Sequence, residues 1–145
     1  MHIRRLFTDD FEEWLRMRLA LWPEYSADEH RAEMETELTD SDWAVFVLAR
    51  QPAGLAGFIE AGLRKYAEGC ATSPVGYIEG WYVDPDVRRA GLGRDLVKAA
   101  EDWACGHGCS EMASDCLLEN LTSFRAHLAL GYEEVERLIH FRKDL

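Results

Sequence analysis

Residues 75–104 read as a strand, a glycine-rich turn and a helix in direct succession, and this unit constrains the fold more than any other stretch. Residues 75–83 are apolar and rich in β-branched and aromatic side chains, which predicts a buried strand. Pro85 ends this run, because proline has no N–H group to donate within a sheet. Beyond the glycines, apolar residues recur at helical spacing, at positions 92, 96, 97, 100, 103 and 104. The sequence therefore predicts a buried strand that leads into a helix with one apolar face.

The turn at the start of this helix has the features of an anion site. Backbone N–H groups are free at a helix N-terminus, and the helix dipole favours negative charge there. Gly91 and Gly93 have no Cβ to keep an anion away from the backbone, and nearby arginines add positive charge. The residues predicted to hold the anion are Arg88, Arg89, Ala90, Gly91, Leu92, Gly93 and Arg94. Their spacing matches neither the G-x-G-x-x-G motif nor the nucleotide P-loop. A glycine turn without a ligand is the alternative interpretation.

Length and charge restrict the class of protein. A chain of 145 residues with 48% hydrophobic content suits one domain, residues 1–145. Its formal net charge of −11 disfavours nucleic acid as a partner and favours a cationic small molecule or a basic peptide, although acidity also simply improves solubility. No apolar run approaches the roughly 20 residues that span a bilayer, and we expect neither a signal peptide nor a membrane partner. The four cysteines and five histidines lack ligand spacing, so we expect reduced thiols, a cytoplasmic protein and no metal.

The predicted elements form one mixed α/β domain (an α+β mixed sheet) in the order β-α-α-β-β-β-α-β-α-β-β. Strands are expected at residues 3–7, 43–50, 55–63, 75–83, 111–114, 132–136 and 138–142, and helices at 11–22, 26–38, 92–104 and 120–130. Asp10 and Ser26 each precede a glutamate by three residues, which predicts two capping boxes. The second helix is notably polar, and such a helix either lies loosely on the surface or lines a wet cleft; we expect it at the rim of a cleft.

Several short segments carry a family resemblance. The R-x-x-G-x-G pattern at residues 88–93 resembles the coenzyme A pyrophosphate loop of the GCN5-related N-acetyltransferases (GNAT). Further segments, in order along the whole chain, resemble the bacterial aminoglycoside 6′-N-acetyltransferases. They are Leu21-Trp22-Pro23, Tyr66-x-x-Gly69-Cys70, Ile78-Glu79-Gly80, residues 111–115, Glu119-Asn120 and residues 127–137. The resemblance implies the GNAT fold, acetyl-CoA as cosubstrate, and direct transfer of its acetyl group to an antibiotic's 6′-amine in a ternary complex, which confers resistance. It also implies a homodimer, in which the closing strand around residues 138–141 pairs with or exchanges into a neighbour.

An aminoglycoside is a polycation, so its site needs carboxylates for the ammonium groups and flat rings for the sugar faces. Glu79, Asp115 and Glu136 come from three different predicted strands or strand ends, and the resemblance assigns them to substrate binding together with Trp22 and Tyr66. Taken singly, Trp22 also suits a core position, Tyr66 a surface loop and Glu136 a solvated strand. Glu79 is harder to explain without a site, because a carboxylate in an apolar strand is costly unless it faces a cleft or a partner.

Acetyl transfer to an amine requires a base, because only the neutral amine is a nucleophile. Asp115 is the first candidate for this base and Glu79 the second. The backbone N–H groups of Trp81, Tyr82 and Val83 are expected to hold the acetyl carbonyl. The resemblance implies that the strand splays at this point and also pairs with the pantetheine arm.

Gly80 is a suitable position for the bulge that splays the strand. The resemblance also places Asn120 against the coenzyme.

His127 stands where many family members have a tyrosine that protonates the leaving thiolate. Histidine can donate a proton near neutral pH, so His127 is a candidate general acid. Two alternatives stay open: the thiolate leaves unaided, or His127 is only a helix residue.

Two other functions are compatible with the sequence. The same fold and chemistry can serve another amine, such as a polyamine or a protein N-terminus. A non-catalytic module that binds acyl-CoA is the third possibility, although the candidate base, the three carboxylates and the complete loop together favour an enzyme.

Overall fold

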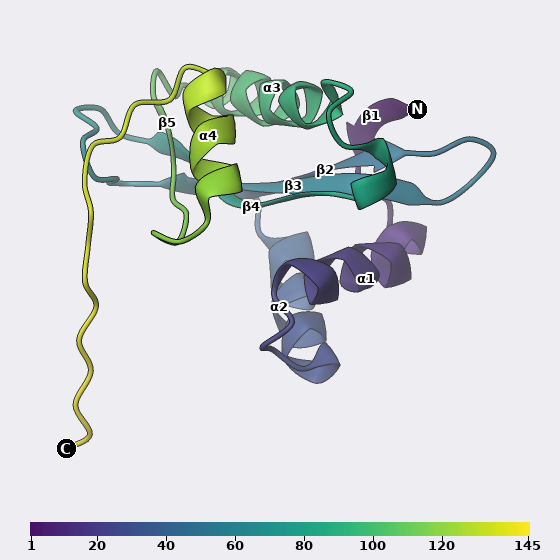
Figure 1. Cartoon of the computed structure of the whole chain (residues 1–145), viewed down its shortest axis with the longest axis horizontal. Helices are drawn as coiled ribbons and strands as arrows, with labels where there is room; N and C mark the ends of the chain where they lie inside the picture. Colours follow the sequence, from purple (N-terminus) through teal and green to yellow (C-terminus); the bar gives the residue numbers. More distant parts are fainter.

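The structure, a computed structural model, describes residues 1–145 and is organised around a five-stranded sheet in the order β1-β2-β3-β4-β5 (Figure 1). The strands are β1 (His2–Arg5), β2 (Trp43–Ala49), β3 (Leu55–Arg64), β4 (Val75–Val83) and β5 (Met112–Ser114). The first four pair antiparallel, whereas β5 runs parallel to β4. The mixed sheet agrees with the predicted α/β class.

Helices cover both faces of the sheet. They are α1 (Phe11–Leu21), α2 (Ala27–Thr39), α3 (Leu92–Gly106) and α4 (Leu121–Ala129), with short 3₁₀ turns at Thr8–Asp10 and Pro85–Val87. Figure 1 shows α1 and α2 below the sheet, α3 above it, and α4 beside β5. None of the helices combines the length and the apolar character needed to cross a bilayer. Three layers result, and the central strands are buried between them.

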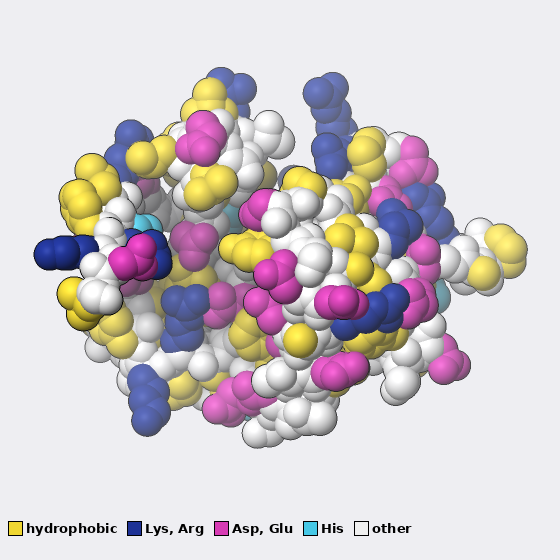
Figure 2. All heavy atoms as spheres, turned by 90° about the horizontal axis from the view of Figure 1, so that it is seen from below, with side chains coloured by type: hydrophobic (Ala, Val, Ile, Leu, Met, Phe, Trp, Pro, Cys, Tyr) yellow, Lys and Arg dark blue, Asp and Glu magenta, His cyan; other side chains and the backbone are white.

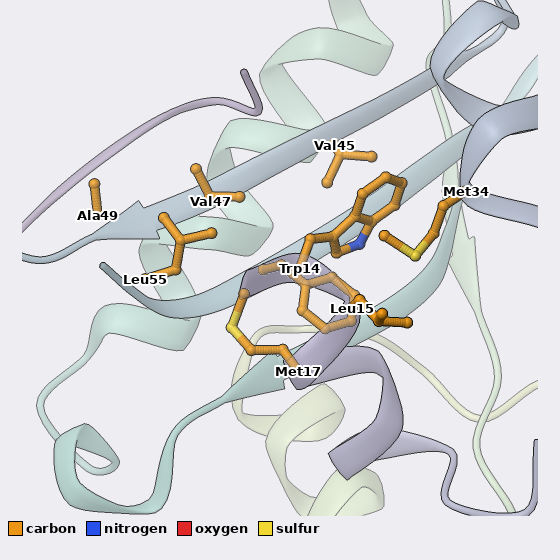
Figure 3. Close-up of a cluster of buried hydrophobic side chains, with 9 residues drawn as sticks. Trp14, Leu15, Met17, Met34, Val45, Val47, Ala49 and Leu55 are labelled. Atoms are coloured by element: carbon orange, nitrogen blue, oxygen red, sulfur yellow. The ribbon is translucent and has the colours of Figure 1, made fainter. Parts of the chain in front are cut away.

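Each face of the sheet has its own hydrophobic cluster. Below, the fully buried Trp14 of α1 lies among side chains of α2 and β2 such as Met34 and Val45 (Figure 3). Above, the predicted apolar face of α3 is confirmed, because Leu96 and Ala100 are fully buried against β2, β3 and β4. Fully burying a leucine-sized side chain contributes about 1.5–3 kcal/mol, so the two clusters hold both helix layers to the sheet.

One of the two predicted capping boxes is present. The Ser26 hydroxyl accepts from the Glu29 N–H at 3.2 Å, and the Glu29 carboxylate accepts from the Ser26 N–H at 2.7 Å. The prediction at Asp10 is wrong, because this side chain makes no cap hydrogen bond to α1. Its carboxylate accepts from Arg4 and from the N–H of Phe7 instead. The Arg4 guanidinium therefore binds the Asp10 carboxylate, which the sequence pattern predicted to cap α1.

The two strands predicted at residues 132–136 and 138–142 are absent, and this part of the prediction is wrong for the single chain. Residues 132–145 form no strand, and most of this segment runs away from the sheet (Figure 1). Apolar side chains in this segment face solvent: Ile139 is 74% exposed and Phe141 92%. A strand exists only when a neighbouring strand accepts its backbone hydrogen bonds, and this chain supplies none to the segment.

The sheet opens along β4. Strand β5 pairs only with Gly76, Tyr77 and Ile78, so the rest of β4 has no neighbour on that side. On the other side, the pairing with β3 passes from Ile78 to Gly80 and leaves Glu79 unpaired. The bulge therefore lies at the predicted position, and the strand splays just beyond it.

Candidate active site

The turn ahead of α3 leaves its backbone amides accessible. Gly91 precedes the helix with φ +80°, a left-handed conformation that favours glycine, and no side chain caps the first turn. A Cβ built on Gly91 would meet no atom within 4 Å, so the space beside these amides is open. The arrangement is the one that binds anions at helix N-termini.

The three arginines of this turn have different roles. Arg88 donates from Nε to the Val83 carbonyl at 2.8 Å and lies over the Tyr82 ring, so it braces the end of β4. Arg89 and Arg94 are exposed and take part in no ion pair. Their charges are available to an anion.

The open edge of β4 begins next to this turn. A Cβ on Gly93 would lie 2.9 Å from the Trp81 ring, which shows how closely the first turn of α3 packs on the strand. The Trp81 indole nitrogen is buried without a partner. Ser114 is the last residue of β5 that pairs with β4, opposite Ile78, and it marks the point where the two strands separate.

Four side chains on the other face form a connected polar cluster, which we call the acidic cluster: Arg64, Tyr77, Glu79 and Asp115. Arg64 donates to both carboxylate oxygens of Glu79, at 2.9 and 2.7 Å. Its guanidinium carbon lies 3.4 Å from the centre of the Tyr77 ring, and the Tyr77 hydroxyl donates to Asp115 at 2.5 Å. The predicted carboxylates Glu79 and Asp115 are thus brought together. Figure 2, viewed from the side of α1 and α2, shows acidic and basic side chains gathered in a hollow of this face.

Electrostatics inside the acidic cluster follow from these contacts. The hydrogen bond with Glu79 raises the pKa of Arg64. Burial, followed by the hydrogen bond to Asp115, raises the pKa of Tyr77. Tyr77 therefore stays a neutral donor, and Arg64 stays a cation, across the physiological range.

Trp22 stands at the edge of this region and is half-buried. Its ring stacks on His30 and lies 5.1 Å from the Arg18 guanidinium carbon. A Cβ on Gly80 would come within 2.5 Å of the Trp22 ring, so only glycine at the β4 bulge leaves room for the indole. One side of the Trp22 ring packs against the hydrophobic cluster below the sheet. This contact is compatible with Trp22 as a core residue and with Trp22 as a wall of the substrate site.

A buried ionic network lies behind Trp22. Arg18 is 3% exposed and contacts three carboxylates, those of Glu33 at 2.6 Å, Glu37 at 2.9 Å and Glu60 at 3.5 Å. The Trp14 indole also donates to Glu60 at 2.8 Å. Burial raises the pKa of both Glu37 and Glu60, although Arg18 opposes the shift, because one guanidinium cannot neutralise three carboxylates.

A hollow lies on α2, but all of its lining residues come from this helix, so the expected cleft rim stays a prediction. Glu33, Thr36 and Glu37 line a hollow of about 340 Å³ on this helix. The carboxylate of Glu37 also feels the charge of Glu79, so it belongs to the same electrostatic region as the acidic cluster.

His127 reaches the point of strand separation through a second side chain. Its Nδ1 lies 2.8 Å from the Ser123 carbonyl oxygen, which can only accept, so Nδ1 carries the proton. Its Nε2 therefore accepts from the Ser114 hydroxyl at 2.7 Å. The ring packs edge-on against Trp81 and Tyr132. His127 is thus held in one orientation, with Ser114 between it and the opening.

Three of the predicted site residues lie outside the acidic cluster and the His127–Ser114 pair. Tyr66 is 67% exposed on the loop after β3, and Glu136 is exposed on the unpaired C-terminal segment. Asn120 is also exposed, and its Oδ1 accepts from the Ser123 N–H as the N-cap of α4.

Sequence reasoning missed Arg64, Tyr77 and Ser114. The only available signal was position: Tyr77 shares a strand with Glu79 two residues away, and Arg64 ends the strand paired with it.

An amide-lined helix N-terminus beside a splayed strand, with a carboxylate cluster on the far side of the sheet, is the architecture of an N-acyltransferase. The chain belongs to the acetyltransferase (GNAT) family, whose family model matches residues 4–132.

Relatives that match this chain over nearly its full length have more specific names than the family. The chain is 46% identical to an aminoglycoside N(6′)-acetyltransferase type 1 of Klebsiella aerogenes, over 99% of this chain and 96% of the relative. It is 40% identical to the protein of the same name from Stenotrophomonas maltophilia, over 99% and 93%. Among solved structures it resembles AAC(6′)-Iy in complex with the bisubstrate analogue CoA-S-monomethyl-acetylneamine, with a TM-score of 0.92, 39% identity and coverage of 99% and 98%. AAC(6′)-Ih from Acinetobacter baumannii also has a TM-score of 0.92, at 34% identity and the same coverage.

Proposed function

We propose that this protein transfers the acetyl group of acetyl-CoA to the 6′-amine of aminoglycosides, by direct transfer in a ternary complex, and thereby confers resistance. One domain, residues 1–145, carries both binding sites in this proposal. The observation that carries it is that Arg64 and Tyr77 join Glu79 and Asp115 into one cluster next to the open edge of β4, in a chain whose full-length relatives bear this activity in their names. The bisubstrate analogue bound by AAC(6′)-Iy supports the ternary complex.

The coenzyme fits the residues present. The uncapped amides after Gly91 and the unpaired charges of Arg89 and Arg94 suit a diphosphate, and a Cβ on Gly91 would meet no atom within 4 Å. On the side away from β3, the backbone of Trp81, Tyr82 and Val83 has no strand neighbour. This open side suits an extended arm and offers N–H donors to the carbonyl that develops negative charge. Asn120 keeps its amide N–H₂ group for the coenzyme. When bound, acetyl-CoA supplies an acyl group activated as a thioester.

The acceptor binds on the acidic cluster in this proposal. Glu79 and Asp115 attract the ammonium groups, while Trp22 and Tyr66 flank the sugars and Glu136 contributes a further carboxylate. Asp115 is the proposed base, because it is exposed to an incoming amine and is held by the Tyr77 hydroxyl. Glu79 is the second candidate, since both of its oxygens are already engaged by Arg64.

In this proposal His127 and Ser114 together donate a proton to the leaving thiolate. A protonated His127 would donate from Nε2 to the Ser114 oxygen, which turns the serine hydroxyl toward the opening between β4 and β5. This makes the proposed acid a two-residue relay rather than histidine alone.

The proposal includes a cytoplasmic homodimer. The C-terminal segment supports it, since exposed apolar side chains such as Leu138, Ile139 and Phe141 lie on a segment that has no strand partner in its own chain. Pairing with a second copy would satisfy the backbone and bury these side chains. The four free cysteines suit a reducing compartment.

The dimer is tested by truncation. A chain ending at Arg137 should sediment as a monomer, whereas the full chain should sediment as a dimer. A full-length monomer at micromolar concentration would reject the homodimer.

The function is tested by following free thiol release from acetyl-CoA with kanamycin, tobramycin, spermidine and a basic peptide. We expect release with the two antibiotics, a product acetylated at the 6′-nitrogen, and a higher inhibitory concentration of kanamycin in a susceptible host that expresses the protein. Release with spermidine or the peptide alone would refute the proposed acceptor.

A further inference from the structure

The acidic cluster already contains a cation. Arg64 ends β3 and makes a bidentate ion pair with Glu79, which is half-buried, while its guanidinium stacks on Tyr77 at 3.4 Å. The charge of Asp115 acts on the same guanidinium. The group therefore has a flat ring beneath it and carboxylates around it, which is the environment expected for a bound ammonium group.

We infer that Arg64 occupies the acceptor's ammonium subsite in the free protein and must be displaced from Glu79 when the substrate binds. The inference rests on the proposed function, and it makes Arg64 a determinant of acceptor affinity. The Arg64 side chain can be displaced into solvent, since it is 41% exposed and Arg64 is the last residue of β3. Glu79, by contrast, is fixed on the β4 bulge over Gly62.

The ion pair between Arg64 and Glu79 has two opposing effects, on the stability of the empty site and on acceptor affinity. Without Arg64, two carboxylates would share one hollow with no cation, in a chain whose formal net charge is already −11. Like charges in a partly desolvated site repel one another, so the guanidinium stabilises the empty site. The same contact lowers acceptor affinity, because the substrate binds only the fraction of molecules from which Arg64 has moved.

An orienting role for Arg64 predicts the opposite result. If Arg64 stayed on Glu79 and held it toward the substrate, removing the guanidinium would weaken binding. The direction of the change therefore separates the two roles.

The experiment compares binding of neomycin and paromomycin, which differ only in a 6′-amine and a 6′-hydroxyl, to protein saturated with CoA so that no turnover occurs. In Arg64→Met, calorimetry should show neomycin binding about fivefold tighter than in the wild type, the size expected when a half-exposed ion pair no longer competes. Paromomycin should change less than twofold, since a hydroxyl does not replace a guanidinium on a carboxylate. Arg64→Lys, which keeps the charge, should lie between Arg64→Met and the wild type.

A matched control removes the same charge elsewhere. Lys98 is exposed on α3 and pairs only with Asp102 one turn away, so Lys98→Met should leave both affinities within twofold. Weaker neomycin binding in Arg64→Met, or equal tightening for both antibiotics, would overturn the inference.

A second measurement separates this inference from the proposed function. The Arg64 Nε–H resonance, identified by its loss in Arg64→Met, should shift when neomycin or spermidine is added to the wild-type protein. If neomycin is never acetylated but spermidine still shifts this resonance, the acceptor is wrong and the displacement of Arg64 stands. A resonance that neither cation moves overturns the inference itself.

Discussion

Substitution of Gly91 by alanine tests the proposed coenzyme site most directly. Gly91 has φ +80°, and a Cβ built on it meets no atom within 4 Å. The new methyl group therefore clashes with nothing in the protein, and its structural cost is the left-handed backbone alone, about 1 kcal/mol. A destabilisation of that size lowers the thermal midpoint of a chain this long by roughly 2–4 °C.

The other end of the same helix offers a matched control. Gly108 follows α3 with φ +85°, and its Cβ would also meet no atom within 4 Å. Gly108→Ala should therefore cost as much stability as Gly91→Ala. Only at Gly91 does the added methyl stand among the uncapped amides of the helix N-terminus.

The two variants should differ in their use of acetyl-CoA. Loss of one hydrogen bond to a charged phosphate is worth about 1.5–3 kcal/mol, which corresponds to roughly a 10- to 100-fold higher KM for acetyl-CoA in Gly91→Ala. The kcat at saturating acetyl-CoA should stay within about threefold of the wild type, because the reacting groups lie elsewhere.

Thiol release at saturating kanamycin, with acetyl-CoA varied, measures both constants, and a thermal scan measures stability. Equal KM values for acetyl-CoA in Gly91→Ala and Gly108→Ala, at equal loss of stability, would refute the placement of the diphosphate at this turn.

Three further predictions concern individual side chains. Asp115→Asn should lower kcat by about 10²–10⁴-fold with an unchanged KM for acetyl-CoA, and undiminished turnover would remove this carboxylate as the base. His127→Phe should slow transfer from acetyl-CoA more than transfer from a thioester of a more acidic thiol, whereas equal slowing would argue against proton donation to the leaving group. The pKa of Glu60 is raised by burial and then by Glu37, so the folded state holds a proton that the unfolded state releases above about pH 4.5. The free energy of unfolding should therefore fall by about 1 kcal/mol or more as pH rises from 5.5 to 8.5, and by less in Glu60→Gln; urea titrations that show equal pH dependence would contradict this.

Much of the fold could be predicted because its signals are local. The apolar run of β4, the proline after it and the helical spacing of α3 lie within thirty or so residues and each depends on near neighbours. The glycine turn before α3 belongs to the same class, because glycine at a left-handed position and free amides at a helix start are properties of a few consecutive residues. The Ser26 capping box was predictable for the same reason.

The acidic cluster was only half predictable. Glu79 stood out as a carboxylate in an apolar strand, but its partner Arg64 lies 15 residues away, and Tyr77 reaches Asp115 across 38. These contacts depend on strand register and on the bulge that leaves Glu79 unpaired, and neither is encoded in a single segment. The failed capping box has a different origin, since Arg4 lies only six residues before Asp10 and binds the carboxylate in place of the helix N–H groups.

The primary structure was sufficient for the layers of helix and sheet, the glycine turn before α3 and the identity of the charged residues, because periodicity and turn chemistry act over short distances. Tertiary structure decided which charges meet: it placed Arg64 on Glu79 and Ser114 between His127 and the open strand. It also left residues 132–145 without a strand partner, because a segment becomes a strand only when another backbone completes its hydrogen bonds.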